Sequence, residues 1–237
     1  MNFNDLKVKI FADGAEISAM KKLHSEGFIS GFTTNPSLMK KAGIKDYESF
    51  AKDALNNFPD MPISFEVFAD EFNEIKDQAL KIASWGQNVV VKIPVSNTKG
   101  VMSYDLINEL SSLNIKLNVT AIFTAEQVNK TYEALKNGPY GNISIFAGRI
   151  FDAGEDAVEI MQDAVNLTKM DDHIELIWAS PRQVYDMVLA SNLGVDIITV
   201  TPDLLSKKNL LGKDLEEYSI ETVKMFFDDA QSNKYSI

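Results

Sequence analysis

The sequence predicts a single α/β domain, a (β/α)8 TIM barrel over residues 1–237, with a C-terminal helix over about 215–231. Three observations predict this fold. Short apolar runs alternate with amphipathic segments along the whole chain, and strict alternation of strand and helix implies parallel strands joined by crossover helices. The length of 237 residues is close to the roughly 250 residues typical of such a barrel. No stretch has the composition of a linker that would divide the chain.

A doubly wound open sheet is the alternative fold. In its dinucleotide-binding form, a Gly-x-Gly-x-x-Gly turn follows the first strand, whereas Asp13-Gly14-Ala15 offers one glycine. The sequence also lacks a Walker A pattern. The barrel is therefore the favoured prediction.

Each predicted strand is a short run of apolar residues, which is typical of a parallel strand buried on both faces. Eight such runs follow one another along the chain. They are Val8–Phe11, Gly31–Thr33, Ile63–Val67, Val89–Ile93, Lys116–Val119, Ile143–Phe146, Glu175–Trp178 and Ile197–Val200.

The segments between these runs carry apolar residues at the spacing of an amphipathic helix. In Ala15–Ser25, for example, Ile17, Met20 and Leu23 share one helical face. The other predicted helices are Asp46–Asn56, Glu71–Ser84, Val101–Leu113, Ala125–Lys136, Glu155–Leu167, Pro181–Ser191 and Leu215–Gln231. The apolar face of the last helix has two possible uses: it could cap the barrel or pack on a neighbouring copy.

Composition excludes several classes of protein. A net charge of −11 and a pI of about 4.7 argue against a nucleic-acid surface. The chain has no cysteine, which excludes disulfides, and its two histidines lie far apart, so no metal site is expected. The N-terminal residues do not resemble a signal peptide, and no apolar stretch approaches the ~18 residues that span a bilayer. We expect a cytoplasmic protein without membrane or nucleic-acid partners.

The most unusual residue is Lys92, which lies within the apolar run Val89–Pro94. Lysine is rarely buried unless it is paired or functional. Burial disfavours the ammonium form, and a neutral amine is what attack on a carbonyl requires. The strand ends at Pro94, so Lys92 lies near the carboxyl end, where barrel enzymes have their active sites. The structural alternative is a lysine whose stem packs while its head reaches water.

Further polar residues follow or end the other strands. They are Asp13, Thr33, Asn35, Glu66, Asn118, Thr120, Ser144, Arg149 and Ser180. Each has a structural alternative: Asp13 as a helix N-cap, Asn35 in a capped turn, Glu66 in a salt bridge, and Arg149 in a surface pair with Asp152. Together, at one end of a barrel and around a buried lysine, they favour a catalytic site.

These residues resemble the signatures of the transaldolase family. The matching motifs span the chain from Asp13 to Gln183. They are Phe11-Ala12-Asp13, Thr33-Thr34-Asn35-Pro36-Ser37, Val91-Lys92-Ile93-Pro94, Asn118-Val119-Thr120-Ala121-Ile122-Phe123, Gly148-Arg149-Ile150 and Pro181-Arg182-Gln183. The length is similar to that of the small branch, which includes the fructose 6-phosphate aldolases. Enzymes of this branch form oligomers, so the resemblance implies a possible homo-oligomer. The resemblance implies a (β/α)8 barrel with the Schiff-base lysine on the fourth strand, which is where counting strands puts Lys92.

The resemblance also implies an activity: transfer of a dihydroxyacetone unit from a ketose phosphate, such as sedoheptulose 7-phosphate, to an aldose phosphate. This belongs to carbohydrate metabolism, in the pentose phosphate pathway, and needs no cofactor. It gives catalytic roles to Lys92, Asp13, Glu66 and Thr120. The implied substrate-binding residues are Thr33, Asn35, Asn118, Ser144, Phe146, Arg149 and Ser180.

Two positions bear on transfer versus simple aldol cleavage. Glu66 and Phe146 match the transaldolase-like enzymes, whereas the aldolase-like enzymes tend to have Gln and Tyr there. One segment departs from the family pattern: Trp178-Ala179-Ser180-Pro181-Arg182-Gln183 is shorter and lacks the basic residue usually found before Pro-Arg-Gln. Because this loop contributes to the family's phosphate site, the far end of the substrate stays open: phosphate, another anion, or a neutral group.

Overall fold

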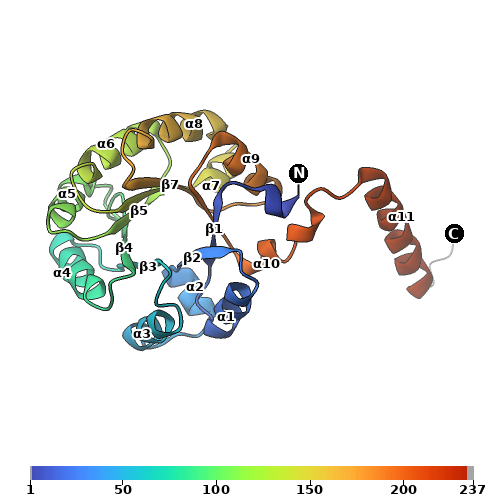
Figure 1. Cartoon of the computed structure of the whole chain (residues 1–237), viewed down its shortest axis with the longest axis horizontal. Coiled ribbons are helices and arrows are strands. Elements are labelled where there is room, and N and C mark those ends of the chain that lie inside the picture. Colours follow the sequence, from blue (N-terminus) through green and yellow to red (C-terminus); the bar gives the residue numbers. More distant parts are fainter. Residues whose placement is uncertain (1, 234–237) are drawn as a thin grey trace.

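The computed structural model describes residues 2–233, and these form a closed barrel of parallel strands with helices around it (Figure 1). The predicted fold class is confirmed. The strands pair in chain order from β1 to β8, and β8 closes on β1. Their bounds are Lys9–Asp13 (β1), Ile29–Thr33 (β2), Ile63–Glu66 (β3), Val89–Pro94 (β4), Leu117–Ile122 (β5), Gly141–Ile145 (β6), Ile174–Trp178 (β7) and Ile197–Val200 (β8).

Every predicted helical segment overlaps a helix, and most of these helices bury an apolar stripe against the barrel or a neighbouring helix. These helices are Ile17–Ser25 (α1), Tyr47–Asn57 (α3), Phe72–Ala83 (α4), Tyr104–Ser112 (α5), Ala125–Leu135 (α6), Ala157–Thr168 (α8), Tyr185–Leu193 (α9) and Leu215–Ser232 (α11). Shorter pieces that hydrophobic periodicity does not predict are η1 (Phe3–Asp5), α2 (Pro36–Lys41), α7 (Ala147–Asp152), α10 (Pro202–Leu205) and η2 (Lys208–Leu210).

Several element boundaries differ from the predicted ones, and two of the differences bear on the site. Strand β1 extends to Asp13, which pairs with Thr33 of β2, so Asp13 is a strand residue and the N-cap of α1 is Glu16. The predicted helix from Pro181 begins only at Tyr185. The carboxylate of Asp186 accepts hydrogen bonds from the backbone N–H groups of Arg182 and Gln183, at 2.6 and 3.2 Å, and this holds the preceding residues in a turn.

The barrel interior has an apolar layer beneath a polar one. Phe11 and Ile197 belong to a buried apolar cluster, and a Cβ on Gly31 would lie 2.6 Å from the Phe11 ring. Glycine at position 31 therefore lets this ring pack against the backbone of β2. Because side chains two residues apart share a face, the next layer toward the carboxyl ends holds Asp13 and, as described below, its polar neighbours.

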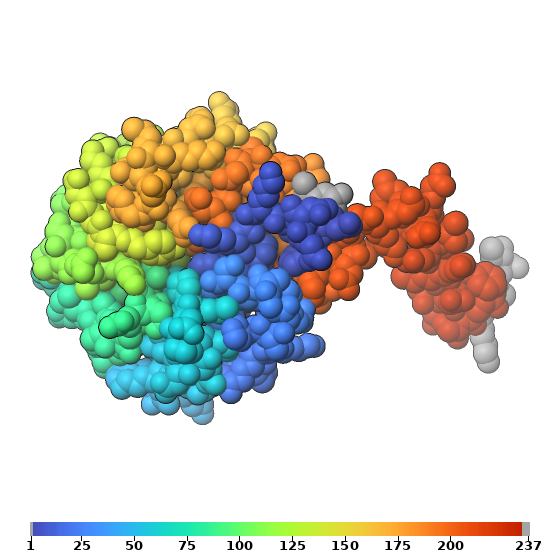
Figure 2. Space-filling model, in the orientation of Figure 1, coloured from blue at the N-terminus to red at the C-terminus, as the bar shows by residue number. Residues whose placement is uncertain are grey.

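Helix α11 lies apart from the barrel (Figures 1 and 2). Among the residues that the structure describes, none in α11 is buried, although the helix carries several large apolar side chains. Strand β8 is followed on the barrel itself only by α10 and η2, so α11 is the eighth long helix of the chain's pattern but does not cover its own barrel. Within residues 2–233 no helix is long and apolar enough to cross a membrane.

Candidate active site

A cavity of about 510 Å³ opens at the carboxyl ends of the strands, where barrel enzymes have their active sites. All of the catalytic and substrate-binding residues predicted from the sequence line it. These are Asp13, Thr33, Asn35, Glu66, Lys92, Asn118, Thr120, Ser144, Phe146, Arg149 and Ser180. Side chains from positions 13 to 180 are thus brought to one chamber.

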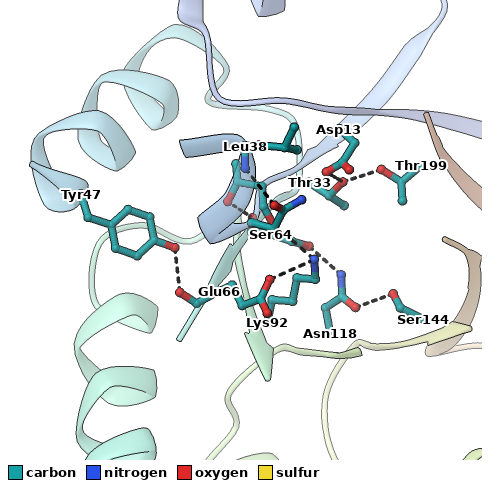
Figure 3. A network of polar contacts seen from close by, with 12 residues as sticks. Asp13, Thr33, Leu38, Tyr47, Ser64, Glu66, Lys92, Asn118, Ser144 and Thr199 are labelled. Atoms are coloured by element: carbon teal, nitrogen blue, oxygen red, sulfur yellow. Dashed lines mark hydrogen bonds and ion pairs between the residues drawn. The ribbon is translucent and has the colours of Figure 1, made fainter. Parts of the chain in front are cut away.

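Lys92 lies at the centre of a polar network on the cavity wall (Figure 3). Only 7% of the residue is exposed, so the snorkelling alternative does not hold. Its Nζ is 3.1 Å from Oε2 of Glu66, its register neighbour on β3, and 3.3 Å from the carbonyl oxygen of Thr34. Because a buried ammonium without partners is costly, these oxygens explain how the apolar strand accommodates a lysine.

The backbone of Glu66 is anchored by Tyr47. The Tyr47 hydroxyl donates to the Glu66 carbonyl oxygen at 2.9 Å, and burial raises the pKa of Tyr47, so this phenol stays a donor at physiological pH. Tyr47 comes from α3, outside the barrel, and it ties that helix to the carboxyl end of β3. The end of β3, and with it the carboxylate beside Lys92, is therefore fixed in place.

A row of amide and hydroxyl groups crosses β3, β5 and β6. Asn118 is fully buried; its Nδ2 donates to Ser64 Oγ at 3.0 Å, and its Oδ1 accepts from Ser144 Oγ at 2.6 Å. These bonds fix which edge of the Asn118 amide faces which strand. One Nδ2 hydrogen and the second lone pair of Oδ1 are not used in these bonds.

Asp13 belongs to a second network, on the opposite side of the barrel opening. Thr33 Oγ1 donates to Asp13 Oδ1 at 2.8 Å and is also hydrogen-bonded to Thr199 Oγ1. Burial raises the pKa of Asp13, while the positive charge of Lys92 and the Thr33 hydrogen bond act in the opposite direction. The carboxyl group is therefore an easier proton acceptor than an exposed aspartate.

Strand β5 is distorted where it borders the cavity. Its register to β6 shifts between Val119 and Ile122, and Ala121 has a φ of +60°, a conformation that costs a non-glycine residue about 1–2 kcal/mol. Bulges of this kind re-aim side chains beside active sites. The adjacent Thr120 hydroxyl is buried and, within the described residues, has no hydrogen-bond partner. A bound molecule or water would satisfy it.

The outer part of the cavity carries the basic residues. The Arg149 guanidinium lies 5.4 Å from the centroid of the Phe146 ring and is exposed. The suggested surface pair of Arg149 with Asp152 is not formed; Asp152 accepts from Arg182 Nε instead, at 2.8 Å. Arg149 therefore keeps its donors available at the cavity mouth, whereas Arg182 is engaged with a carboxylate.

The loop after β7 packs closely on α7. A Cβ on Gly148 would lie 1.8 Å from the carbonyl oxygen of Ser180, so only glycine allows this approach. Ser180 has a φ of +60° and lines the cavity. On the opposite side Asn35 caps α2, because its Oδ1 accepts from the N–H of Leu38 at 3.0 Å. The cap uses the carbonyl oxygen and leaves the amide donors.

The order and character of these residues agree with comparisons to known proteins. The sequence matches the family described as Transaldolase/Fructose-6-phosphate aldolase over residues 10–236. The chain belongs to this family. It is 33% identical to a probable transaldolase of Nitrosopumilus maritimus (strain SCM1) over 202 residues, which cover 84% of this chain and 86% of that protein.

Two further relatives give the same picture. A probable transaldolase of Dehalococcoides mccartyi (strain ATCC BAA-2266 / KCTC 15142 / 195) is 35% identical over 194 residues, 81% of this chain and 86% of that protein. One of Streptococcus pyogenes serotype M5 (strain Manfredo) is 36% identical over 201 residues, 84% of this chain and 89% of that protein. The resemblance drawn from the motifs is confirmed, and the chain is an enzyme of the aldolase and transferase type.

The sequence prediction missed several cavity or network residues, of which Ser64, Thr199 and Ala121 are the most instructive. Ser64 shares a strand face with Glu66, and Thr199 shares one with Ile197, so alternation within each apolar run could have found both. Ala121, which lines the cavity through a left-handed backbone conformation, left no signal, because alanine in an apolar strand predicts an ordinary extended residue.

Proposed function

We propose that this protein is a Schiff-base transaldolase, which transfers a dihydroxyacetone unit from a ketose phosphate such as sedoheptulose 7-phosphate to an aldose phosphate. The observation that carries this proposal is Lys92, a buried amine 3.1 Å from the Glu66 carboxylate in the cavity at the barrel's carboxyl end. Such an amine suits covalent catalysis on a carbonyl. Thr120 and Asp13 supply proton-transfer groups within the same chamber.

Imine formation is the first step. Lys92 gives up a proton and attacks the C2 carbonyl carbon of the ketose, and the resulting carbinolamine loses water to become an iminium ion. This step needs protons moved to and from the C2 oxygen. Glu66 and Thr120 hold the water that moves them, a role supported by the ion pair to Lys92 and by the unpartnered Thr120 hydroxyl.

Cleavage of the carbon–carbon bond follows. Asp13 takes the proton of the C4 hydroxyl, the C3–C4 bond breaks, and its electron pair moves into the iminium to give an enamine on Lys92. The aldehyde that contained C4 leaves. When an acceptor aldehyde arrives, the enamine carbon attacks it, Asp13 returns its proton to the new hydroxyl oxygen, and water releases the product ketose. The iminium is itself the electron sink, so the steps balance without a cofactor.

Retention of the three-carbon unit separates transfer from cleavage. We assign Asn118, Ser144 and Asn35 to its hydroxyl groups, because each lines the cavity and keeps unused hydrogen-bonding capacity. Arg149 is assigned to the distal phosphate, for which a planar guanidinium is suited, and Thr33 and Ser180 complete the walls. Glu66 and Phe146 favour transfer; release of free dihydroxyacetone by an aldolase is the alternative.

Borohydride trapping tests the proposal. With fructose 6-phosphate, reduction is expected to leave a three-carbon or six-carbon adduct on the peptide that contains Lys92, detected by mass spectrometry. Lys92→Ala should abolish both adduct and turnover, whereas Lys99→Ala, at a lysine whose side chain is 63% exposed, should keep both. Absence of an adduct at Lys92 would overturn the mechanism. Dihydroxyacetone release without acceptor, at the rate of transfer, would instead identify an aldolase.

We further propose that the enzyme is a homo-oligomer in which α11 docks on a second copy of the chain. The exposed apolar face of α11 supports this, as does an apolar groove of about 270 Å³ between α1, α2 and α10, where the barrel has no long eighth helix. As an enzyme of sugar phosphates, in the pentose phosphate pathway, it is proposed to act in the cytoplasm.

A further inference from the structure

Resting on the proposed function, we infer that Thr199 is a positioning residue for this reaction: through Thr33, its hydroxyl holds Asp13 as the proton acceptor. Thr199 stands outside every motif that carries the family resemblance. It lies on β8, lines the cavity and is nearly buried. The only hydrogen bond of its side chain among the described residues joins it to the Thr33 hydroxyl.

The three side chains come from neighbouring strands. Strand β1 pairs with β2 on one side and β8 on the other, with Asp13 opposite Thr33 and Phe11 opposite Thr199. Figure 3 shows Thr33 between the Asp13 carboxylate and Thr199. The two threonine hydroxyls therefore meet in front of β1, inside the barrel, and form a continuous chain that ends at the carboxylate.

The number of hydrogens fixes the direction of this chain. A hydroxyl has one hydrogen to donate, and an ionised Asp13 can only accept. The Thr33 hydrogen is therefore committed to Asp13 at 2.8 Å, so the bond between the threonines must use the hydrogen of Thr199. The lone pairs of Thr199 Oγ1 are then open to a donor in the cavity, such as a substrate hydroxyl.

Protonation of Asp13 removes that constraint. Once Asp13 has taken the proton of the C4 hydroxyl, its own O–H can donate to Thr33, and Thr33 can donate to Thr199. The same three groups are satisfied in both states with only hydroxyl rotations and no side-chain rearrangement. Hydrogen bonds in a chain strengthen one another, so Thr199 stabilises the carboxylate although it does not touch it.

The charged groups around Asp13 determine how strongly the threonine hydrogen bonds must favour its ionised form. Lys92 faces it from β4 and favours the carboxylate, while burial favours the neutral acid. The groove behind Asp13 is lined by Glu16, by Lys41 of α2 and by Asp203 of α10, the last two as a 4.0 Å ion pair. Loss of the Thr199 hydroxyl would therefore leave Lys92 and a Thr33 hydroxyl without its own donor as the groups that favour ionised Asp13.

The test is the pH profile of Thr199→Val, which keeps the side chain's shape and removes its hydroxyl. The assay converts fructose 6-phosphate and erythrose 4-phosphate to sedoheptulose 7-phosphate. We expect kcat/KM at pH 7 to fall about 3–10-fold and its acidic limb to move up by about half a pH unit. Thr199→Ser should restore the wild-type limb. Thr131→Val, on α6 and outside the cavity lining, removes a buried hydroxyl that has no partner among residues 2–233, and it should change neither.

The outcomes separate this inference from the proposed function. If wild-type enzyme gives no borohydride adduct at Lys92, the proposed function fails first. If wild-type enzyme is trapped and active but the acidic limb of Thr199→Val stays in place, the positioning role is wrong. Adduct formation in Thr199→Val should persist, because Asp13 acts after the imine has formed. If the valine variant does not fold, Thr199→Ala carries the same test with a smaller side chain.

Discussion

Two residues at the centre of the site, Lys92 and Asp13, are ionisable groups inside an apolar barrel, and their buried charges are stabilised differently. Lys92 has carboxylate and carbonyl oxygens as partners, whereas Asp13 has a single hydroxyl donor and a cation farther away. For Asp13 the partners do not cancel the cost of burial, and its pKa is raised. A carboxyl group in this condition is suited to accept a proton from a sugar hydroxyl and to return it.

Because the partners of Asp13 do not offset the cost of burying its charge, its protonation should affect the stability of the fold. Because the pKa of Asp13 is raised on folding, the folded state binds a proton more tightly than the unfolded state, so wild-type stability falls as pH rises from the ordinary aspartate range through the raised value. Asp13→Asn removes the charge. We expect it to abolish transfer but to raise Tm at pH 8, by roughly 2–4 °C for each kcal/mol gained in a chain of this size.

Thermal unfolding followed by circular dichroism between pH 4 and pH 8 measures this effect. The advantage of Asp13→Asn should shrink as the pH falls toward the ordinary aspartate range, because the raised pKa lets the folded wild-type carboxyl take up its proton earlier than the unfolded one. A variant that is less stable by the same amount at every pH would show that Asp13 contributes through packing and not through its charge.

At this scale the sequence was informative where a residue type contradicted its surroundings. Lys92 and Asn118 are polar residues in apolar runs, and that contrast predicted their position in the cavity. Thr199 was missed because a threonine is ordinary in a strand. The pairing of Arg182 with Asp152 was also missed, since it depends on how a loop and a short helix meet, and no local pattern encodes that.

Among the elements, strands and long helices were predictable and the short pieces between them were not. An apolar run or stripe repeats over enough residues to be recognised, but α7 has six residues and α10 four. Their positions depend on contacts with neighbouring loops. The boundary of α9 is a case in point: Asp186 holds the residues before it in a turn, although the helical pattern continues through them.

The contact between α7 and the loop after β7 allows a prediction at this scale. Gly148→Ala would place a Cβ 1.8 Å from the Ser180 carbonyl oxygen and 3.2 Å from Arg182 Cγ, so the loop must move. Overpacking of this kind costs about 1–3 kcal/mol, and Tm should fall by several degrees. Because Ser180 lines the cavity, KM for a phosphorylated ketose should rise more than kcat falls.

Calorimetry and steady-state kinetics measure the two effects. Gly14→Ala is the control for stability, because its new Cβ would meet no atom nearer than 3.9 Å. An unchanged Tm for Gly148→Ala would mean that the loop yields without cost. An unchanged KM beside a lowered Tm would separate the loop from substrate binding.

For the whole molecule, alternation and length were enough to predict the barrel, because a closed parallel sheet is the compact way to cover both faces of eight such strands. They could not predict where the last helix lies. The segment Leu215–Gln231 has the pattern of one more amphipathic helix. Its apolar face would suit either of two positions: a cap on its own barrel, or a contact with a second copy. The structure excludes the first choice for a single chain, since no described residue of α11 is buried.

The remaining choice, docking of α11 on a second copy, predicts the oligomeric state. Val223 and Phe227 are 63% and 62% exposed and lie four residues apart on one face, and burying such side chains contributes about 1.5–3 kcal/mol each. Light scattering should therefore give wild-type enzyme a mass that is a multiple of 26.4 kDa. The double variant Val223→Ser/Phe227→Ser should give a single-chain mass with a wild-type circular dichroism spectrum. Asp229→Asn, on the opposite face of α11, should remain assembled. A wild-type protein that is monomeric at assay concentration would contradict the docking and leave the apolar face of α11 without a function in assembly.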